Sequence, residues 1–168
     1  GFLQNKRKIE EIVSYREGNW WVQDFSSSFP IRSIAKLHKY KKFLDMCAAP
    51  GGKSFQILSR NLNITLNDKS KARIKLMKNN LRRLKFNPRI INKNFENLDS
   101  NIKFDFIILD APCSSIGTIR KNPEIFFKSK EPKITELVEI QSKMLKKASE
   151  IVELNGIILY MVCSFLYI

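Results

Sequence analysis

Short apolar runs that alternate with amphipathic helical patterns constrain the fold of this chain more than any other feature. We expect five strands, at residues 42–46, 63–67, 89–93, 104–109 and 157–162. Helical patterns lie between them, at residues 54–60, at 70–84 with Ser70 as the N-cap, and at 134–152, where Asn155 and Gly156 stop the helix. Strands that alternate with helices predict an α/β domain with a mostly parallel sheet.

The excess of basic residues indicates the kind of partner. The 168 residues contain 30 Lys and Arg against 16 Asp and Glu, which gives a net charge of +14. This charge favours a polyanionic partner such as nucleic acid. Heavy use of Lys, Ile and Asn leaves codon bias as a second explanation of the same charge. A hydrophobic fraction of 43% is enough for one folded domain.

The few cysteines and histidines limit the chemistry. Cys47, Cys113 and Cys163 form an odd set without paired spacing, which argues against a disulfide framework or a zinc site and favours a reducing, cytoplasmic location. His38 is the single histidine, so no His-based metal site or catalytic triad is expected. The longest apolar run, residues 156–168, is shorter than the ~20 residues that cross a membrane. We therefore expect neither a metal nor a membrane as a partner.

The loop after the first strand has the composition of a ligand site. In parallel sheets ligands bind at the carboxyl ends of strands, so the residues there are the most informative. The loop consists of Cys47, Ala48, Ala49, Pro50, Gly51, Gly52 and Lys53, and its small residues let the backbone approach a ligand closely. A phosphate-binding P-loop needs glycine where Cys47 stands, and the G-x-G-x-x-G fingerprint is absent. A loop for S-adenosylmethionine, which has no phosphates, fits better.

Acidic and sulfur side chains follow three of the other strands. Asp68 follows the second strand, where an acid can accept hydrogen bonds from both ribose hydroxyls, although a charge at a helix entry is also common. Asp110 and Cys113 follow the fourth strand, and Cys163 follows the fifth. Amino-group methyltransferases usually have an aromatic residue where Cys113 stands, so this cysteine favours methylation of carbon. If the fourth and fifth strands are neighbours, about 5 Å apart, these three side chains share one rim.

Four segments together resemble the Sun/Fmu family of RNA cytosine-5 methyltransferases. They are residues 18–24, 43–53, 104–120 and 141–164, and they cover nearly the whole chain in the order that the family shows. The resemblance implies a Rossmann-like, doubly wound methyltransferase sheet. It implies one catalytic domain over residues 1–168, with a lead-in segment at 1–40 and the core of the sheet at 41–168. The family domain has further strands beside the fifth, so we expect C-terminal strands to be missing here.

The resemblance also implies the cofactor and its contacts. The cofactor is S-adenosylmethionine, and the expected binding residues are the loop from Cys47 to Lys53, Asp68, Asn94 and Asp110. Asn94 stands where the family has an acid near the adenine, so this position carries no charge here. Val162 stands where the family has Thr before the nucleophilic cysteine.

The implied reaction is methylation of cytosine carbon 5 in RNA, and the expected RNA is ribosomal RNA. By resemblance, Cys163 adds to carbon 6 of the base and Cys113 takes part in release. Asp110, if it holds a proton, can donate to the ring nitrogen and stabilise the adduct. DNA cytosine methyltransferases use a Pro-Cys at the fourth strand instead, which here would make Cys113 the nucleophile. The residues alone leave both assignments open, and the resemblance favours Cys163.

Two other functions remain open at this point. One is an inactive remnant of such an enzyme that at most binds RNA through its charge, as the expected missing strands would favour. The other is a methyltransferase that acts on a protein or a small molecule. Two cysteines and an acid on one rim argue against the second of these.

Overall fold

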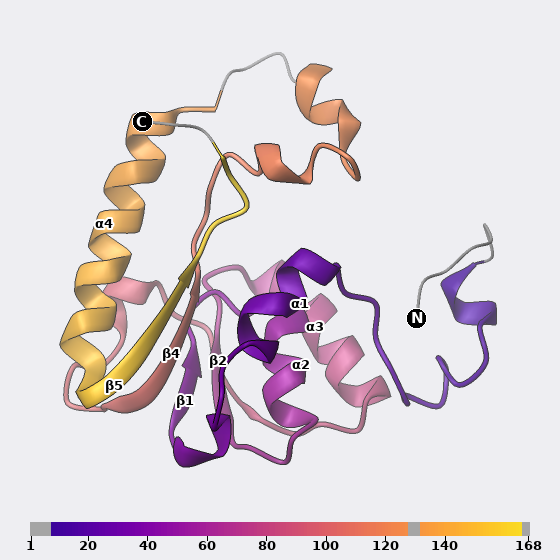
Figure 1. Ribbon diagram of the computed structural model, residues 1–168, viewed down its shortest axis with the longest axis horizontal. Coiled ribbons are helices and arrows are strands. Elements are labelled where there is room, and N and C mark those ends of the chain that lie inside the picture. The colour runs from indigo at the N-terminus through magenta and orange to yellow at the C-terminus, as the bar shows by residue number, and fades with distance from the viewer. Residues whose placement is uncertain (1–7, 128–131, 166–168) are drawn as a thin grey trace.

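The chain folds around one five-stranded sheet. The structure, a computed structural model, describes residues 8–127 and 132–165 (Figure 1). The strands are β1 (Phe43–Asp45), β2 (Ile64–Asn67), β3 (Arg89–Ile91), β4 (Phe104–Asp110) and β5 (Val152–Met161). Their order is β3-β2-β1-β4-β5, and every neighbouring pair is parallel. The strand order runs one way from β1 to β3 and the other way from β1 to β5, so the prediction of a doubly wound α/β sheet is confirmed.

Helices cover both faces of the sheet. The α-helices are α1 (Phe25–Arg32), α2 (Gly52–Leu58), α3 (Lys71–Arg83) and α4 (Ile134–Ile151). Figure 1 shows α1, α2 and α3 on one face and α4 on the other. The inner strands β1, β2 and β4 are largely buried on both sides: Phe43, Phe106 and Ile108 pack toward α2 and α3, whereas Leu44 and Ile107 pack toward α4. Double burial explains why the strands lack a polar alternation.

The expected start of α3 is confirmed. The Ser70 side chain accepts a hydrogen bond from the Arg73 amide at 3.3 Å, which satisfies one of the free N–H groups in the first turn. Ile74, Met77 and Leu81 form the buried stripe of this helix. Asp24 caps α1 in the same way by accepting from the Ser26 amide at 2.9 Å.

The expected end of α4 is wrong. The helix ends at Ile151, and Val152 already begins β5, opposite Phe104 in β4. The next register pair joins Phe106 to Ile157, so the residues between form a bulge in β5. Asn155 does adopt a left-handed conformation, with φ of 64°, but it does so inside this bulge. A turn residue in a β-bulge and one in a helix cap have the same local signal, and only the pairing with β4 separates them.

The lead-in segment packs against α2 and α3. The ring of Trp21 meets Phe55 of α2 edge-on, with 5.8 Å between the ring centroids. The Arg83 guanidinium of α3 donates to the backbone oxygens of Tyr15 and Trp20 at 2.7 and 2.9 Å, and it stacks over the Tyr15 ring. These contacts fix the path of the chain before α1. Within the described ranges, no helix is long and apolar enough to cross a lipid bilayer.

Candidate active site

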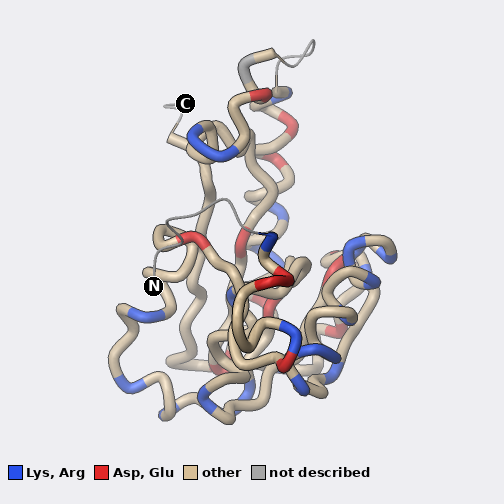
Figure 2. The backbone as a smooth tube through the Cα atoms, turned by 90° about the vertical axis from the view of Figure 1, so that its right-hand side faces the viewer, with Lys and Arg blue, Asp and Glu red and all other residues tan. Residues whose placement is uncertain are grey.

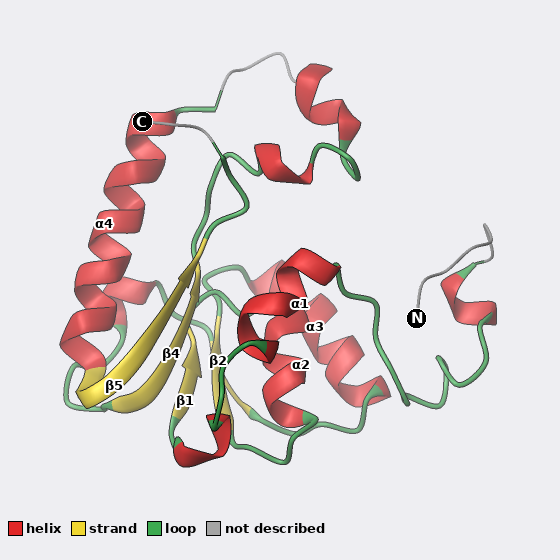
Figure 3. Cartoon of the chain, viewed as in Figure 1, coloured by secondary structure: helices red, strands yellow, loops and turns green. Residues whose placement is uncertain are grey.

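The carboxyl ends of β1, β2, β4 and β5 meet at one rim of the sheet. Figure 3 shows the loops and short turns that follow β4 and β5 rising together above this rim. The short 3₁₀ turns Ile116–Thr118 and Pro123–Phe127 lie in the loop after β4. The amide of Gly117 donates to the backbone oxygen of Cys163 at 2.9 Å, so the loops after β4 and β5 are joined directly.

Asp45 anchors the loop that follows β1. Its carboxylate accepts from the Ser54 hydroxyl of α2 at 2.6 Å and from the Cys47 amide at 3.3 Å, and only 1% of the residue is exposed. Burial raises the pKa of Asp45 from 3.8 to about 7, while the hydrogen bond from Ser54 opposes that rise. The buried Asp45 carboxyl therefore stabilises the turn between β1 and α2 through these two hydrogen bonds, without facing solvent.

Gly51 makes the sharp turn into α2 possible. Its φ of 112° lies in the region that favours glycine, and a Cβ atom there would lie 2.3 Å from the Phe55 ring. The loop around it has small side chains, and Ala48 and Ala49 are buried. A ligand at this edge of the sheet would therefore meet mainly the loop backbone.

Asp68, at the end of β2, lies against the same loop. One carboxylate oxygen accepts from the Ala49 amide at 3.2 Å and the other from the Ser70 amide at 2.9 Å. The Arg73 guanidinium lies 3.4 Å from Asp68 and also donates to the Ala49 backbone oxygen. The polar face of α3 is therefore more than a solvated surface, because the first turn of this helix brings Arg73 over the loop.

The end of β3 reaches Asp68 through Asn92, a residue that was not among the expected site residues. The Asn92 amide donates to the backbone oxygens of Asp68 and Lys69 at 2.8 and 3.1 Å. Asn94 is exposed, and its amide donates to the Glu96 carboxylate at 2.8 Å. Sequence reasoning missed Asn92, since only the parallel pairing of β2 and β3 brings it to Asp68.

Lys53 and Asp110 join the loop after β1 to the end of β4. Lys53 lies in the first turn of α2, and its ammonium is 2.5 Å from the Asp110 carboxylate. The Lys53 side chain is 14% exposed and the Asp110 side chain 38% exposed, so the acid faces the rim. The sequence indicated both residues as site candidates, but not that they form a pair.

Cys113 and Cys163 lie side by side, as the adjacency of β4 and β5 requires. Their sulfur atoms are 3.0 Å apart, and the Cys163 amide donates to the Cys113 sulfur at 3.2 Å. The Cys163 sulfur lies 3.5 Å from the Ser115 hydroxyl. The hydroxyls of Ser114 and Ser164 are 2.8 Å apart and form a second bridge between the same two loops.

The three thiols differ in their surroundings. Burial raises the pKa of Cys47 to about 12, and the Asp45 carboxyl adds to that rise, so this thiol stays protonated at neutral pH. Burial also raises the pKa of Cys163, but the Ser115 hydroxyl opposes the rise, and the residue is exposed. Cys163 is therefore the more exposed of the two rim thiols, with the partly exposed Cys113 as its immediate neighbour.

The rim thus combines two adjacent thiols, a carboxylate–ammonium pair and a loop of small residues that touches a buried acid. Thiols of this kind serve as nucleophiles once deprotonated, and a carboxylate beside an ammonium can accept and return a proton. No cluster of His, Cys, Asp and Glu within residues 8–127 and 132–165 is arranged to hold a metal ion.

Comparison with known proteins agrees with the Sun/Fmu resemblance. The chain is 35% identical to the ribosomal RNA small subunit methyltransferase B of Photorhabdus laumondii over 92% of its length, and 37% identical to that of Sodalis glossinidius over 98%. It spans only 37% and 39% of those two proteins.

Solved structures show the same fold. NSun6 from Pyrococcus horikoshii, in a structure with SFG, aligns with a TM-score of 0.83 and 27% identity over 96% of this chain and 42% of its own. A methyltransferase homologue from the same organism aligns with a TM-score of 0.76 and 27% identity over 96% of this chain and 52% of its own. The family model described as 16S rRNA methyltransferase RsmB/F matches residues 33–167, and the chain belongs to that family.

Proposed function

We propose that this chain is the catalytic domain of an S-adenosylmethionine-dependent RNA methyltransferase that methylates carbon 5 of cytosine in ribosomal RNA. The observation that carries the proposal is the pair of thiols, Cys113 and Cys163, with their sulfur atoms 3.0 Å apart at the ends of β4 and β5. Methylation of an amino nitrogen needs no thiol, whereas methylation of the weakly nucleophilic carbon 5 needs a covalent activator.

The loop after β1 fits S-adenosylmethionine. SFG, the compound in the NSun6 structure, is an analogue of this cofactor. Residues Cys47 to Lys53 would contact the cofactor mainly through their backbone, and Asp68 would accept hydrogen bonds from the ribose hydroxyls. Asp68 is 2% exposed beneath the half-exposed Arg73, so the Arg73 side chain must turn aside as the ribose enters. Asn94 would offer its amide oxygen to the adenine amine in place of the usual acid.

Attack on the base begins with Cys163. Its proton passes to the Asp110 carboxylate, and the thiolate adds to carbon 6 of a cytosine that has left any stack. Asp110 then donates that proton to the ring nitrogen N3, and the electrons of the carbon 5–carbon 6 double bond become available at carbon 5. S-adenosylmethionine, when bound, would supply an electrophilic methyl group to carbon 5, and its sulfur would keep the electron pair of the broken sulfur–methyl bond. Lys53, 2.5 Å from Asp110, balances the charge of the carboxylate whenever it gives up the proton.

Release reverses the addition. Cys113 gives its own proton to the Asp110 carboxylate, which has already protonated N3, and then accepts the proton from carbon 5 as a thiolate. The electrons of that C–H bond restore the double bond as the bond between carbon 6 and sulfur breaks. Cys163 leaves as a thiolate and takes up the N3 proton, and Asp110 releases the one remaining proton to water. Attack and elimination need separate groups at the same carbon–carbon bond, and two thiols in contact provide them.

The proposal is tested by trapping the covalent complex. Cys163→Ala should abolish both methyl transfer and any adduct with RNA, because the attacking atom is gone. Cys113→Ala should still form the adduct but fail to resolve it, so a denaturant-resistant protein–RNA complex accumulates on gels. Ser149→Ala is a control for the loss of a small polar side chain, since this exposed residue of α4 donates to the Lys146 backbone oxygen and should leave both steps in place.

Two results would contradict this assignment. Loss of the adduct in Cys113→Ala with retention in Cys163→Ala would make Cys113 the nucleophile. No adduct between the unmutated chain and an RNA that contains 5-fluorocytosine, together with no heat of S-adenosylmethionine binding in calorimetry, would indicate an inactive remnant.

A further inference from the structure

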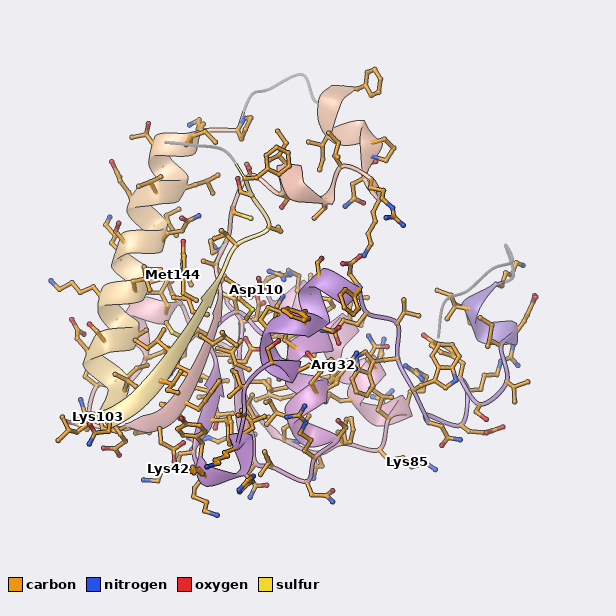
Figure 4. The ribbon with its side chains drawn as sticks, viewed as in Figure 1. Arg32, Lys42, Lys85, Lys103, Asp110 and Met144 are labelled. Carbon is orange, nitrogen blue, oxygen red and sulfur yellow. The ribbon has the colours of Figure 1, made fainter. Side chains whose placement is uncertain are left out.

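A basic groove lies at the amino ends of the strands, at the opposite end of the sheet from the rim. It encloses about 760 Å³ and is lined by residues that precede or begin β1, β2, β3 and β4. Figure 4 shows Lys42 and Lys103 at this lower end of the molecule, well below Asp110. β4 runs from the groove to the rim over seven residues, or about 20 Å at the usual rise of a strand. The groove is therefore separate from the proposed active site.

Four cations line the groove against one acid. Lys41, Lys42, Arg89 and Lys103 contribute the positive charge, and Glu153 is the one acidic residue in the lining. Lys103 donates to the Glu150 backbone oxygen. Within the described part of the chain, no carboxylate forms an ion pair with Lys41, Lys42 or Arg89. Figure 2 shows the same imbalance, with blue positions outnumbering red ones along the lower end of the tube.

The fold holds these cations in place. The Asp105 carboxylate accepts from the backbone amides of Lys41 and Lys42 at 2.7 and 2.8 Å, which fixes the segment before β1. Arg89 is the first residue of β3, so its backbone is paired with β2. The charged residues therefore belong to the ordered amino ends of the strands and not to a freely moving tail.

The remaining polar lining suits a phosphate backbone. Asn61, Asn63, Asn87 and Asn101 line the groove, and all four are exposed. Side-chain amides and basic groups are the donors that most often bind nucleic-acid phosphates and sugars. From β3 to β4 the groove crosses three strand spacings, or about 15 Å, which suits an elongated polyanion better than a single small anion.

We propose that this groove binds the sugar–phosphate backbone of RNA, as a second contact remote from the rim. The proposal rests on RNA being the substrate, and it adds a site that supplies affinity without taking part in methyl transfer. A folded RNA can reach both ends of the sheet at once, with the target cytosine at the rim and another segment in the groove. The contact is largely independent of base sequence, because phosphates carry no sequence information.

The test compares two triple variants that remove the same charge. The groove triple replaces three cations of the lining that form no ion pair with a described residue, and it consists of Lys41→Gln, Lys42→Gln and Arg89→Gln. The matched control, Lys75→Gln, Lys78→Gln and Lys146→Gln, changes exposed lysines on α3 and α4, which also lack an ion pair among the described residues. The probe is labelled polyuridine, whose binding is followed by fluorescence anisotropy across a salt series. This RNA contains no cytosine, so it reports binding whether or not the chain is an active methyltransferase.

We expect the groove triple to weaken polyuridine binding at least tenfold at low salt. The slope of log affinity against log salt should fall by about 2, since each lost phosphate contact on a single strand removes about 0.7. The control triple should change the affinity by less than about threefold. Both triples should unfold at the same temperature as the unmutated chain.

Three outcomes would overturn the proposal. The first is an equal loss of polyuridine affinity in the two triples, and the second is no binding of polyuridine by the unmutated chain. The third is tighter binding of polyglutamate than of polyuridine, with polyglutamate binding weakened by the groove triple to the same extent. Trapping with short RNA that contains 5-fluorocytosine separates the two proposals. If the groove triple still forms the adduct, the rim functions without the groove, whereas absence of the adduct in the unmutated chain refutes the proposed reaction alone.

Discussion

The buried acid beneath the loop after β1 should make the stability of this protein depend on pH. Asp45 is 1% exposed, and its burial raises its pKa from 3.8 to about 7. In the unfolded chain the carboxyl loses its proton near pH 3.8, whereas in the folded chain it keeps the proton until about pH 7. Between these values the folded state binds more protons than the unfolded state, so the free energy of unfolding falls as pH rises.

The size of this effect follows from the two pKa values. Each pH unit between them costs about 1.4 kcal/mol, so Asp45 contributes a fall of about 4 kcal/mol between pH 4 and pH 7. The stabilisation is fully present below pH 3.8 and is lost above about pH 7. A change of this size is a large part of the net stability of a small domain.

Asp45→Asn removes the titration and keeps the shape of the side chain. The difference in free energy of unfolding, variant minus unmutated chain, should rise by about 4 kcal/mol from pH 4 to pH 7. Urea unfolding followed by circular dichroism at each pH measures it, provided that the transition is two-state.

Ser54→Ala provides a second arm of the same test. Ser54 donates to Asp45 at 2.6 Å and holds its pKa down, so this variant should extend the fall in stability to higher pH. Parallel curves for Asp45→Asn and the unmutated chain would refute the reasoning, whatever constant offset separates them.

Two further predictions concern the rim. Asp68→Ala should weaken S-adenosylmethionine binding at least tenfold, about 1.4 kcal/mol, because the ribose loses a charged acceptor; calorimetry measures this, and an unchanged affinity would contradict the ribose role. Cys113 and Cys163 should join on treatment with diamide, since their sulfur atoms are 3.0 Å apart. Mass spectrometry without reductant should show the loss of two hydrogen atoms from the unmutated chain, and Cys113→Ser should prevent it. A chain that remains fully reduced would show that the thiols are not in contact.

Much of the fold was readable from local patterns. Strands β1 to β4 and the helix from Lys71 begin close to where periodicity predicts, because each pattern depends on residues that are near in the chain, whereas β5 begins at Val152 and not at residue 157. The end of α4 was not readable. Asn155 and Gly156 have the same left-handed preference in a helix cap and in a bulge, and the choice depends on pairing with β4, which lies almost fifty positions earlier.

The sequence by itself determined the chemical groups of the site and their placement after strands: Cys113 and Asp110 after β4, Cys163 after β5 and Asp68 after β2. Only the tertiary structure decided which of these groups meet. The adjacency of β4 and β5 brings the two thiols into contact, and α2 carries Lys53 to Asp110.

Contacts between distant segments also decided the parts that the sequence did not indicate. Arg73 lies over Asp68, Asn92 links the end of β3 to Asp68, and a basic groove forms where the amino ends of four strands come together. Periodicity and motifs describe one segment at a time, whereas a pair or a groove requires the sheet to place segments side by side. Strand order and register are set by packing of the whole domain, and that is the reason these features appear only in the folded chain.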